Sequence, residues 1–235
     1  MSNPYFKFKQ FTVWHDKCAM KVGTDGVLLG AWAPVEGVKQ ILDVGTGTGL
    51  ISLQLAQRKP DACITAIEID EAAAQQADEN VARSAWNNRI KVVCCDFANF
   101  QAENKFELIV SNPPYFVDAL KCPDDQRRLA RHTETLNYEL LFRKSANLLS
   151  EQGILGIIIP SEAEKNVIDT AWKYHLFPAR RLNVFTKPGK PCRRVLLAFS
   201  FQDAKCLEDN LYIQIEHNRF SPEYIALTRE FYMKM

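Results

Sequence analysis

Short apolar runs alternate with longer amphipathic segments from residue 40 onward. The runs are rich in Val, Ile, Leu and Phe, which is typical of strands buried on both faces of a sheet. Because strands that alternate with helices form sheets covered by helices, the pattern predicts an α/β fold with a mostly parallel sheet and helices on both faces. The seven predicted strands are Gln40–Val44, Cys63–Ile69, Ile90–Cys95, Phe106–Ser111, Gly153–Pro160, Ala179–Phe185 and Arg194–Phe201.

Helices are predicted between these strands, and two of them have recognisable first residues. Ser161 and Glu164 have the spacing of a capping box, in which each side chain satisfies a backbone amide at the start of a helix. Ser221 followed by Pro222 predicts a closing helix, because proline is favoured at the first helical position. The predicted helices are Gly49–Gln57, Glu71–Ser84, Tyr138–Leu149, Glu162–Tyr174 and Pro222–Met233.

Length and composition fit one domain. The chain has 235 residues, of which 47% are hydrophobic and 24% are charged, so a sizeable core is available. We expect a single domain over residues 1–235, with a lead-in at 1–35, an α/β core at 36–201 and a C-terminal extension at 202–235. No window approaches the roughly 18 apolar residues of a membrane span, and the first residues lack the apolar core of a secretory signal. We therefore expect a cytoplasmic protein without membrane contact. We also expect it to be a monomer.

Charge and metal-ligand types exclude several classes of function. The formal net charge of +1 at pH 7 is not the strongly basic balance of a protein that coats nucleic acid, so any nucleic-acid contact must be local. The seven cysteines form no CxxC pair and fit a reducing compartment. The four histidines show no metal-ligand spacing. The sequence therefore predicts neither a disulfide framework nor a metal site.

A glycine-rich turn follows the first predicted strand. Gly45, Gly47 and Gly49 come directly after Asp43-Val44 and open a predicted helix. Glycines at such a place permit a tight turn and a close approach of the backbone to a ligand. Their Gly-x-Gly-x-Gly spacing differs from the dinucleotide fingerprint, whose last glycine falls one place later. The motif predicts a nucleotide-like ligand, and S-adenosyl-L-methionine fits because it has no pyrophosphate to anchor. We expect Asp43 to belong to the same cofactor site.

Acidic side chains end the next two predicted strands. Glu68 lies about 20 residues beyond the glycine loop, where a carboxylate can accept hydrogen bonds from both ribose hydroxyls. Asp70 fits the N-cap of the helix that begins at Glu71. Asp96 either accepts a hydrogen bond from the adenine amino group of the cofactor or caps a loop. Because parallel strands place their carboxyl ends at one edge of a sheet, these residues predict a cofactor site at that edge.

Asn112-Pro113-Pro114-Tyr115 ends the fourth predicted strand and indicates the chemistry. Consecutive prolines break helices and central strands, so they serve a rigid turn that fixes the direction of the Pro113 carbonyl. An aromatic amine delocalises its lone pair into the ring, and methyl transfer requires that pair to point at the methyl group. The Asn112 amide oxygen and the Pro113 carbonyl can accept the two amine hydrogens and stabilise the developing positive charge. Tyr115 can stack on the planar base. We expect all four residues to be catalytic, with Asn112 also touching the cofactor.

At these residues the chain resembles class I methyltransferases that act on amino groups, which carry the glycine motif and an Asn/Asp-Pro-Pro-aromatic motif in this order. Residues 8–11, 15–32, 130–136 and 194–199 are similar to segments of the bacterial tRNA1(Val) adenine-37 N6-methyltransferase family. The resemblance spans almost the whole chain. It implies the seven-stranded Rossmann-like methyltransferase fold, a cofactor pocket that includes Lys21 to Thr24, and N6 of adenine 37 in a valine tRNA as the target.

Two basic clusters are candidates for contact with RNA phosphates. Residues 173–194 include no acidic residue and are interleaved with aromatic side chains, which is typical of a phosphate surface. A second cluster follows the Asn-Pro-Pro-Tyr motif, where a target base would enter. Charge runs are often only solvated faces. The members are Lys173, Arg180, Arg181, Lys187, Lys190, Arg193 and Arg194 in the first cluster, and Arg127, Arg128 and Arg131 in the second.

Other functions fit parts of the pattern. A protein-glutamine N5-methyltransferase acts on an amide nitrogen, which has a similarly delocalised lone pair, but the resemblance of the lead-in disfavours it. DNA adenine methyltransferases share the chemistry, yet residues 202–235 are too few for the target-reading domain that sequence-specific ones generally carry. A non-catalytic RNA-binding module is disfavoured by the intact Asn112 and the complete glycine loop.

Overall fold

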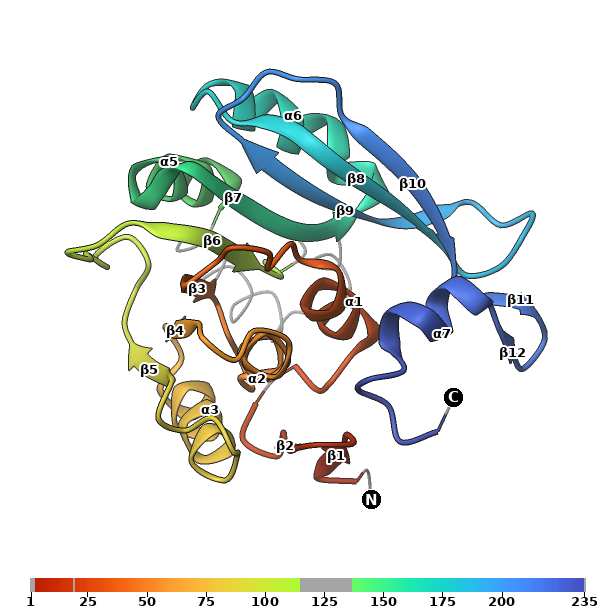
Figure 1. Cartoon of the computed structure of the whole chain (residues 1–235), viewed down its shortest axis with the longest axis horizontal. Coiled ribbons are helices and arrows are strands. Elements are labelled where there is room, and N and C mark those ends of the chain that lie inside the picture. The colour runs from red at the N-terminus through yellow and green to blue at the C-terminus, as the bar shows by residue number, and fades with distance from the viewer. Residues whose placement is uncertain (1–2, 19, 115–136, 235) are drawn as a thin grey trace, which may run out of the picture.

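A twisted sheet runs through the centre of the molecule (Figure 1). The structure is a computed structural model that describes residues 3–18, 20–114 and 137–234. Within these residues the sheet has eight strands, in the order β10-β8-β9-β7-β6-β3-β4-β5. Their bounds are β3 Gln40–Val44, β4 Cys63–Glu68, β5 Ile90–Cys94, β6 Phe106–Ser111, β7 Leu149–Pro160, β8 Phe177–Phe185, β9 Cys192–Ser200 and β10 Leu207–Tyr212.

All seven predicted strands are present, and the predicted α/β class with a mostly parallel sheet is confirmed. Only β9 runs against its neighbours, β7 and β8, within the described sheet. The predicted number of strands in the sheet was too low by one, because β10 pairs in parallel with β8 as an eighth strand. In β10 only Leu211 is buried, so its sequence lacks the apolar run by which the other strands were recognised.

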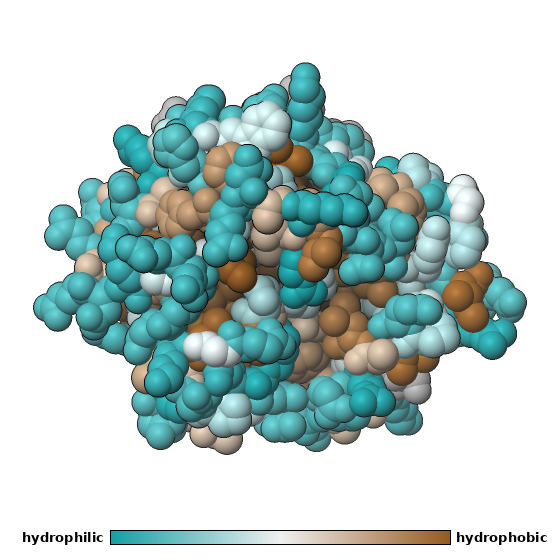
Figure 2. All heavy atoms as spheres, turned by 45° about the horizontal axis from the view of Figure 1, so that its top comes forward, coloured by the Kyte–Doolittle hydropathy of each residue, from teal (hydrophilic) through white to brown (hydrophobic). Residues whose placement is uncertain are grey.

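Helices cover both faces of the sheet, as predicted, and bury two separate apolar clusters (Figure 1). One face carries α1 (Thr24–Trp32), α2 (Leu50–Arg58), α3 (Glu71–Ala82) and α7 (Pro222–Thr228), and the other carries α5 (Tyr138–Leu148) and α6 (Glu164–Trp172). Polar side chains cover most of the face shown in Figure 2, with apolar ones visible between them. Within the described residues, no helix is both long enough and apolar enough to cross a membrane.

The first residues of three helices confirm two of the predicted helix caps and contradict the third. The predicted N-caps are confirmed, since Asp70 accepts a hydrogen bond from the amide of Ala73 at 2.8 Å and Ser221 accepts one from Tyr224 at 3.0 Å. The prediction of a capping box at Ser161 was wrong. Its hydroxyl donates to the carbonyl of Cys192 at 2.9 Å, and a short 3-10 turn, η2 (Ser161–Ala163), precedes α6.

The two ends of the described chain pack against each other. A hairpin of β1 (Tyr5–Lys7) and β2 (Thr12–Trp14) opens the molecule, and a small hairpin of β11 (Gln214–Glu216) and β12 (Arg219–Phe220) precedes α7. The closing helix was predicted to end at Met233 but ends at Thr228, so the prediction was too long. Beyond it the chain turns so that the amide of Lys9 donates to the carbonyl of Phe231 at 2.8 Å.

Candidate active site

The glycine loop follows β3 with all three glycines in the left-handed region. Their φ angles are 71° for Gly45, 56° for Gly47 and 80° for Gly49, a conformation that side chains with a Cβ rarely adopt. A Cβ added at Gly47 would meet no atom within 4 Å, whereas one at Gly49 would lie 3.5 Å from Cα of Ala77 in α3. Gly49 therefore permits contact between the loop and a helix, and Gly47 borders open space that a ligand can fill.

Asp43 lies at the base of this loop and is completely buried. Its Oδ2 accepts hydrogen bonds from the hydroxyls of Thr46 at 2.6 Å and Ser52 at 2.7 Å, while its Oδ1 has no partner within the described residues. Burial raises the pKa of this carboxyl to about 6, although the two hydroxyls act in the opposite direction. Asp43 thus fixes the loop from below and retains one acceptor oxygen.

Glu68 ends β4 and joins that strand to the glycine loop. Its Oε2 accepts from the amide of Gly47 at 2.8 Å, and its Oε1 accepts from Ile69 at 2.9 Å and Asp70 at 3.1 Å. A carboxylate offers about four lone pairs, so this arrangement leaves roughly one for a ribose hydroxyl, where the sequence predicted acceptance from both. Glu68 lies at the predicted place, and it also shapes the loop.

Asp96 caps a loop just beyond β5. Its Oδ1 accepts a hydrogen bond from the amide of Ala98 at 2.8 Å, while the residue stays half-buried. The end of β5 is tied to β4, because the amide of Cys95 donates to the carbonyl of Glu68 at 2.9 Å. The loop-cap role of Asp96 is therefore observed, and its contact with an adenine amino group stays a prediction.

The end of β6 places Asn112 beside the glycine loop. Ser111 pairs with Val44 in the sheet, and its hydroxyl donates to the Val44 carbonyl at 2.9 Å. The next residues of the two strands, Asn112 and Gly45, therefore begin adjacent turns at the same edge. Asn112 is half-buried, as is Pro114, and Pro113 is buried. Tyr115 lies outside the described residues, as do Arg127, Arg128 and Arg131.

The lead-in is fastened to α3 by two buried amide side chains that the sequence analysis missed. Asn80 donates to the carbonyls of Trp14 at 2.8 Å and Thr48 at 2.9 Å, and it accepts from the amide of Trp14 at 2.9 Å. Gln76 accepts from the amide of Lys17 at 3.1 Å. These residues lie four apart on the buried face of an amphipathic helix, and polar residues at such positions were the available signal.

These hydrogen bonds also place the lead-in close to Glu68 and Asp70. Burial raises the pKa of the Cys18 thiol to about 12, and the negative charges of Glu68 and Asp70 add to the effect. Lys21 and Thr24 follow a few residues later and are exposed. Thr24 is also the first residue of α1, an element that the sequence analysis did not predict. Their contact with a cofactor stays a prediction.

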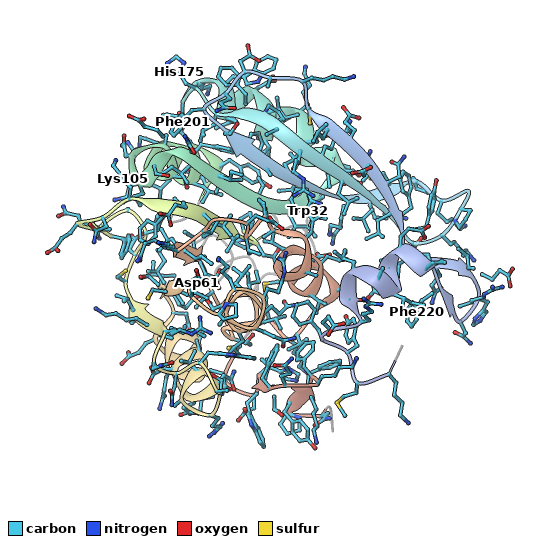
Figure 3. All side chains as sticks on the ribbon, viewed as in Figure 1. Trp32, Asp61, Lys105, His175, Phe201 and Phe220 are labelled. Carbon is cyan, nitrogen blue, oxygen red and sulfur yellow. The ribbon has the colours of Figure 1, made fainter. Side chains whose placement is uncertain are left out.

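Adjacent arginines of the first basic cluster face opposite sides of the sheet, as neighbours in a strand must. Arg180 places its guanidinium 5.0 Å from the ring centroid of Trp32, which lies between α1 and the sheet (Figure 3). Arg181 instead pairs with Glu164 at 2.8 Å and Glu208 at 3.2 Å. The cluster therefore does not form one surface on one face of the sheet.

Two further members of this cluster are also engaged within the chain. Arg194 pairs with Asp25 of α1 at 2.8 Å, and Lys173 pairs with Glu139 of α5 at 3.2 Å. Lys173 lines a cavity of about 540 Å³ between the first turn of α5 and α6, a cavity that none of the predicted cofactor-binding residues lines. Lys187, Lys190 and Arg193 are exposed around the turn from β8 to β9, with no ion pair to the described part of the chain.

Comparisons with known proteins define the class. Residues 22–175 match the family model of the methyltransferase small domain. A solved structure described as a predicted O-methyltransferase from Agrobacterium tumefaciens is similar with a TM-score of 0.64 and 20% identity, over 88% of this chain and 96% of that one. A TehB-like SAM-dependent methyltransferase from Corynebacterium glutamicum has a TM-score of 0.52 and 18% identity, over 77% and 89%. These two structures share the fold, and the family model makes the chain a methyltransferase.

Curated relatives narrow the class to one family. A Bacteroides thetaiotaomicron protein named tRNA1(Val) (adenine(37)-N6)-methyltransferase is 56% identical over 236 residues, covering 100% of both chains. A protein of the same name from Enterobacter sp. (strain 638) is 45% identical over 233 residues, covering 98% of this chain and 95% of the relative. The chain belongs to the family of these tRNA1(Val) (adenine(37)-N6)-methyltransferases, as its resemblance implied.

Proposed function

We propose that this protein transfers the methyl group of S-adenosylmethionine to N6 of adenine 37 in tRNA1(Val). The observation that carries the proposal is the pairing of Ser111 with Val44, because it sets Asn112 directly beside the glycine loop. In this arrangement the glycine loop would hold the methyl donor, and Asn112 would hold the acceptor amine next to it. The names of the full-length relatives support tRNA1(Val) as the substrate.

The residues around the glycine loop fit S-adenosylmethionine. The open space beside Gly47 can receive its nucleoside, and the buried Oδ1 of Asp43 is an acceptor that still needs a donor. Glu68 and Asp96 would bind the ribose and the adenine amino group, and Lys21, Thr24, Gly45, Gly49 and Asn112 would line the rest of the site. When bound, this cofactor supplies an electrophilic methyl group on a positively charged sulfur.

The chain's own contribution to the reaction is orientation. The Asn112 amide oxygen and the Pro113 carbonyl accept the two hydrogens of the target amine, which turns the nitrogen lone pair toward the methyl group. The same acceptors stabilise the positive charge that grows on nitrogen, and one proton leaves to solvent after transfer. Tyr115 stacks on the base. Adenine 37 lies in a loop, so presenting it requires no base pair to be broken.

Transfer of a labelled methyl group to separate substrates tests this proposal. The substrates are unmodified tRNA1(Val), the same tRNA with A37→G, duplex DNA, and a release factor carrying a GGQ glutamine. Label in the first substrate alone is the expected result. Label that persists in the A37→G tRNA would refute the position, and label in the release factor would favour the glutamine methyltransferase.

A further inference from the structure

We propose that the turn between β8 and β9 binds RNA phosphates a few nucleotides away from the target nucleotide. This inference rests on the proposed function and names the part of the surface that the tRNA uses. We call residues 186–193 the basic hairpin. Its three cationic side chains are Lys187, Lys190 and Arg193, all exposed.

The topology brings the basic hairpin to the catalytic edge of the sheet. β6, β7 and β8 all run in one direction, because β6 is parallel to β7 and both β7 and β8 are antiparallel to β9. The turn after β8 therefore projects from the same edge as the turn that carries Asn112. In Figure 1 this turn reaches out beyond the end of β8.

Ion pairing separates the basic hairpin from the rest of its cluster. Arg181, Arg194 and Lys173 have carboxylate partners at 2.8 to 3.2 Å, and Arg180 lies over Trp32. The cations of the hairpin have no ion pair with the described part of the chain. A phosphate that binds there need not displace a carboxylate, so the three positive charges remain available to a polyanion.

The backbone of the basic hairpin is held in place by a hydrogen-bonded turn, two prolines and an aromatic contact at its base. The amide of Lys190 donates to the carbonyl of Lys187 at 3.2 Å across Gly189, whose φ is 74°. Pro188 within this turn and Pro191 directly after it restrict the backbone further. At its base, Phe185 stacks on Tyr212 with ring centroids 5.0 Å apart. The cations are therefore presented at a fixed place on the scaffold, which reduces the entropy lost when RNA binds.

Strand spacing indicates which phosphates the hairpin reaches. β9 and β8 lie two and three strands from β6, which corresponds to roughly 10 to 15 Å at the usual spacing between strands. That distance is too long for contact with the target base itself and fits phosphates a few nucleotides away. The hairpin should therefore affect tRNA affinity without changing the chemical step.

The test is the double charge reversal Lys187→Glu/Lys190→Glu in the full-length protein, with Lys91→Glu/Lys205→Glu as the matched control. Lys91 near the start of β5 and Lys205 just before β10 are exposed at the opposite edge of the sheet. Three quantities are measured for each protein: tRNA1(Val) affinity across a salt series, methyl transfer at saturating tRNA, and S-adenosylmethionine affinity.

The hairpin variant should bind tRNA at least about 10-fold more weakly at 0.1 M salt, with the slope of log affinity against log salt shallower by about 2. Methyl transfer at saturating tRNA and cofactor affinity should match the wild type, and the control should change neither affinity nor slope. An unchanged slope, or an equal loss in the control, would overturn the proposal. Wild-type protein that binds tRNA through the hairpin but transfers no methyl group would contradict the proposed function instead.

Discussion

The glycine loop and the basic hairpin are turns at the same edge of one sheet, yet they are built in opposite ways. The glycine loop is held by Asp43, Glu68 and Asn80 through hydrogen bonds of 2.6 to 2.9 Å, and its Thr46 and Thr48 are buried. The basic hairpin is exposed and carries cations without ion pairs in the described structure. A small ligand needs a few polar groups fixed in advance, whereas a polyanion needs accessible charge.

Asn112→Ala should produce the largest effect of these variants, a loss of turnover without a loss of cofactor binding. Loss of one preorganised acceptor should lower turnover by about 10² to 10³, because the amine lone pair is no longer held in line with the methyl group. Single-turnover kinetics and calorimetry together separate chemistry from binding. Cofactor affinity should stay nearly unchanged, and a variant with wild-type turnover would contradict the mechanism.

Asp43→Asn tests whether the buried carboxyl of Asp43 makes the free energy of unfolding depend on pH. The native pKa of Asp43 is raised from 3.8 to about 6 by burial, so the folded protein binds more protons than the unfolded chain between these values. The free energy of unfolding should therefore fall as pH rises from about 4 to about 6, by about 3 kcal/mol for this group.

Urea denaturation of ligand-free protein at several pH values between 4 and 7 measures this contribution. The difference in free energy of unfolding between Asp43→Asn and wild type should change over that range in favour of the variant as pH rises. A difference that stays constant with pH would show that Asp43 does not titrate in this way.

Gly47→Val should abolish the close approach of a ligand while leaving the fold intact. Gly37→Val is a matched control, because Gly37 also has a positive φ, 74°, and open space around its Cβ position. Both variants should lose about 1 to 2 kcal/mol of stability from the left-handed backbone. Only Gly47→Val should weaken S-adenosylmethionine binding, by about 100-fold or about 2.7 kcal/mol. Equal cofactor affinity of the two variants in calorimetry would remove the loop from the site.

Arg181→Gln should give the smallest effect and sharpen the contrast with the basic hairpin. Because Arg181 is neutralised by Glu164 and Glu208, its loss should leave tRNA affinity and the salt dependence of binding unchanged. Stability should fall by at most about 1 kcal/mol, since the pairs are partly exposed. A drop in tRNA affinity like that expected for the hairpin variant would mean that ion pairing does not decide which cations bind RNA.

Local signals made most of the fold predictable. The strands were found because buried apolar runs such as Phe106–Ser111 stand out in the sequence. α1 was missed because seven of its nine residues are buried, so it lacks the polar face that identifies a surface helix. Gly30 in α1 shows why such a helix depends on tertiary contacts, since a Cβ there would lie 2.3 Å from the side chain of Gln54.

The candidate site was predictable where a motif is contiguous and not where it depends on long-range contacts. Asp43, Glu68 and Asn112 were located by their positions at strand ends. The partners of Arg181 and Arg194 lie 17 to 169 residues away in the chain, so no local pattern could separate these paired cations from Lys187 and Lys190. The role of Asn80 likewise depends on Trp14, 66 residues away.

Mass spectrometry of tRNA1(Val) from cells that lack this protein measures whether the protein methylates adenine 37 in the cell. We predict that N6-methyladenosine at position 37 disappears on deletion, returns with the wild-type protein, and fails to return with Asn112→Ala expressed at the same level. Persistence of the modification after deletion would contradict the proposed function, and its full restoration by Asn112→Ala would contradict the role of Asn112.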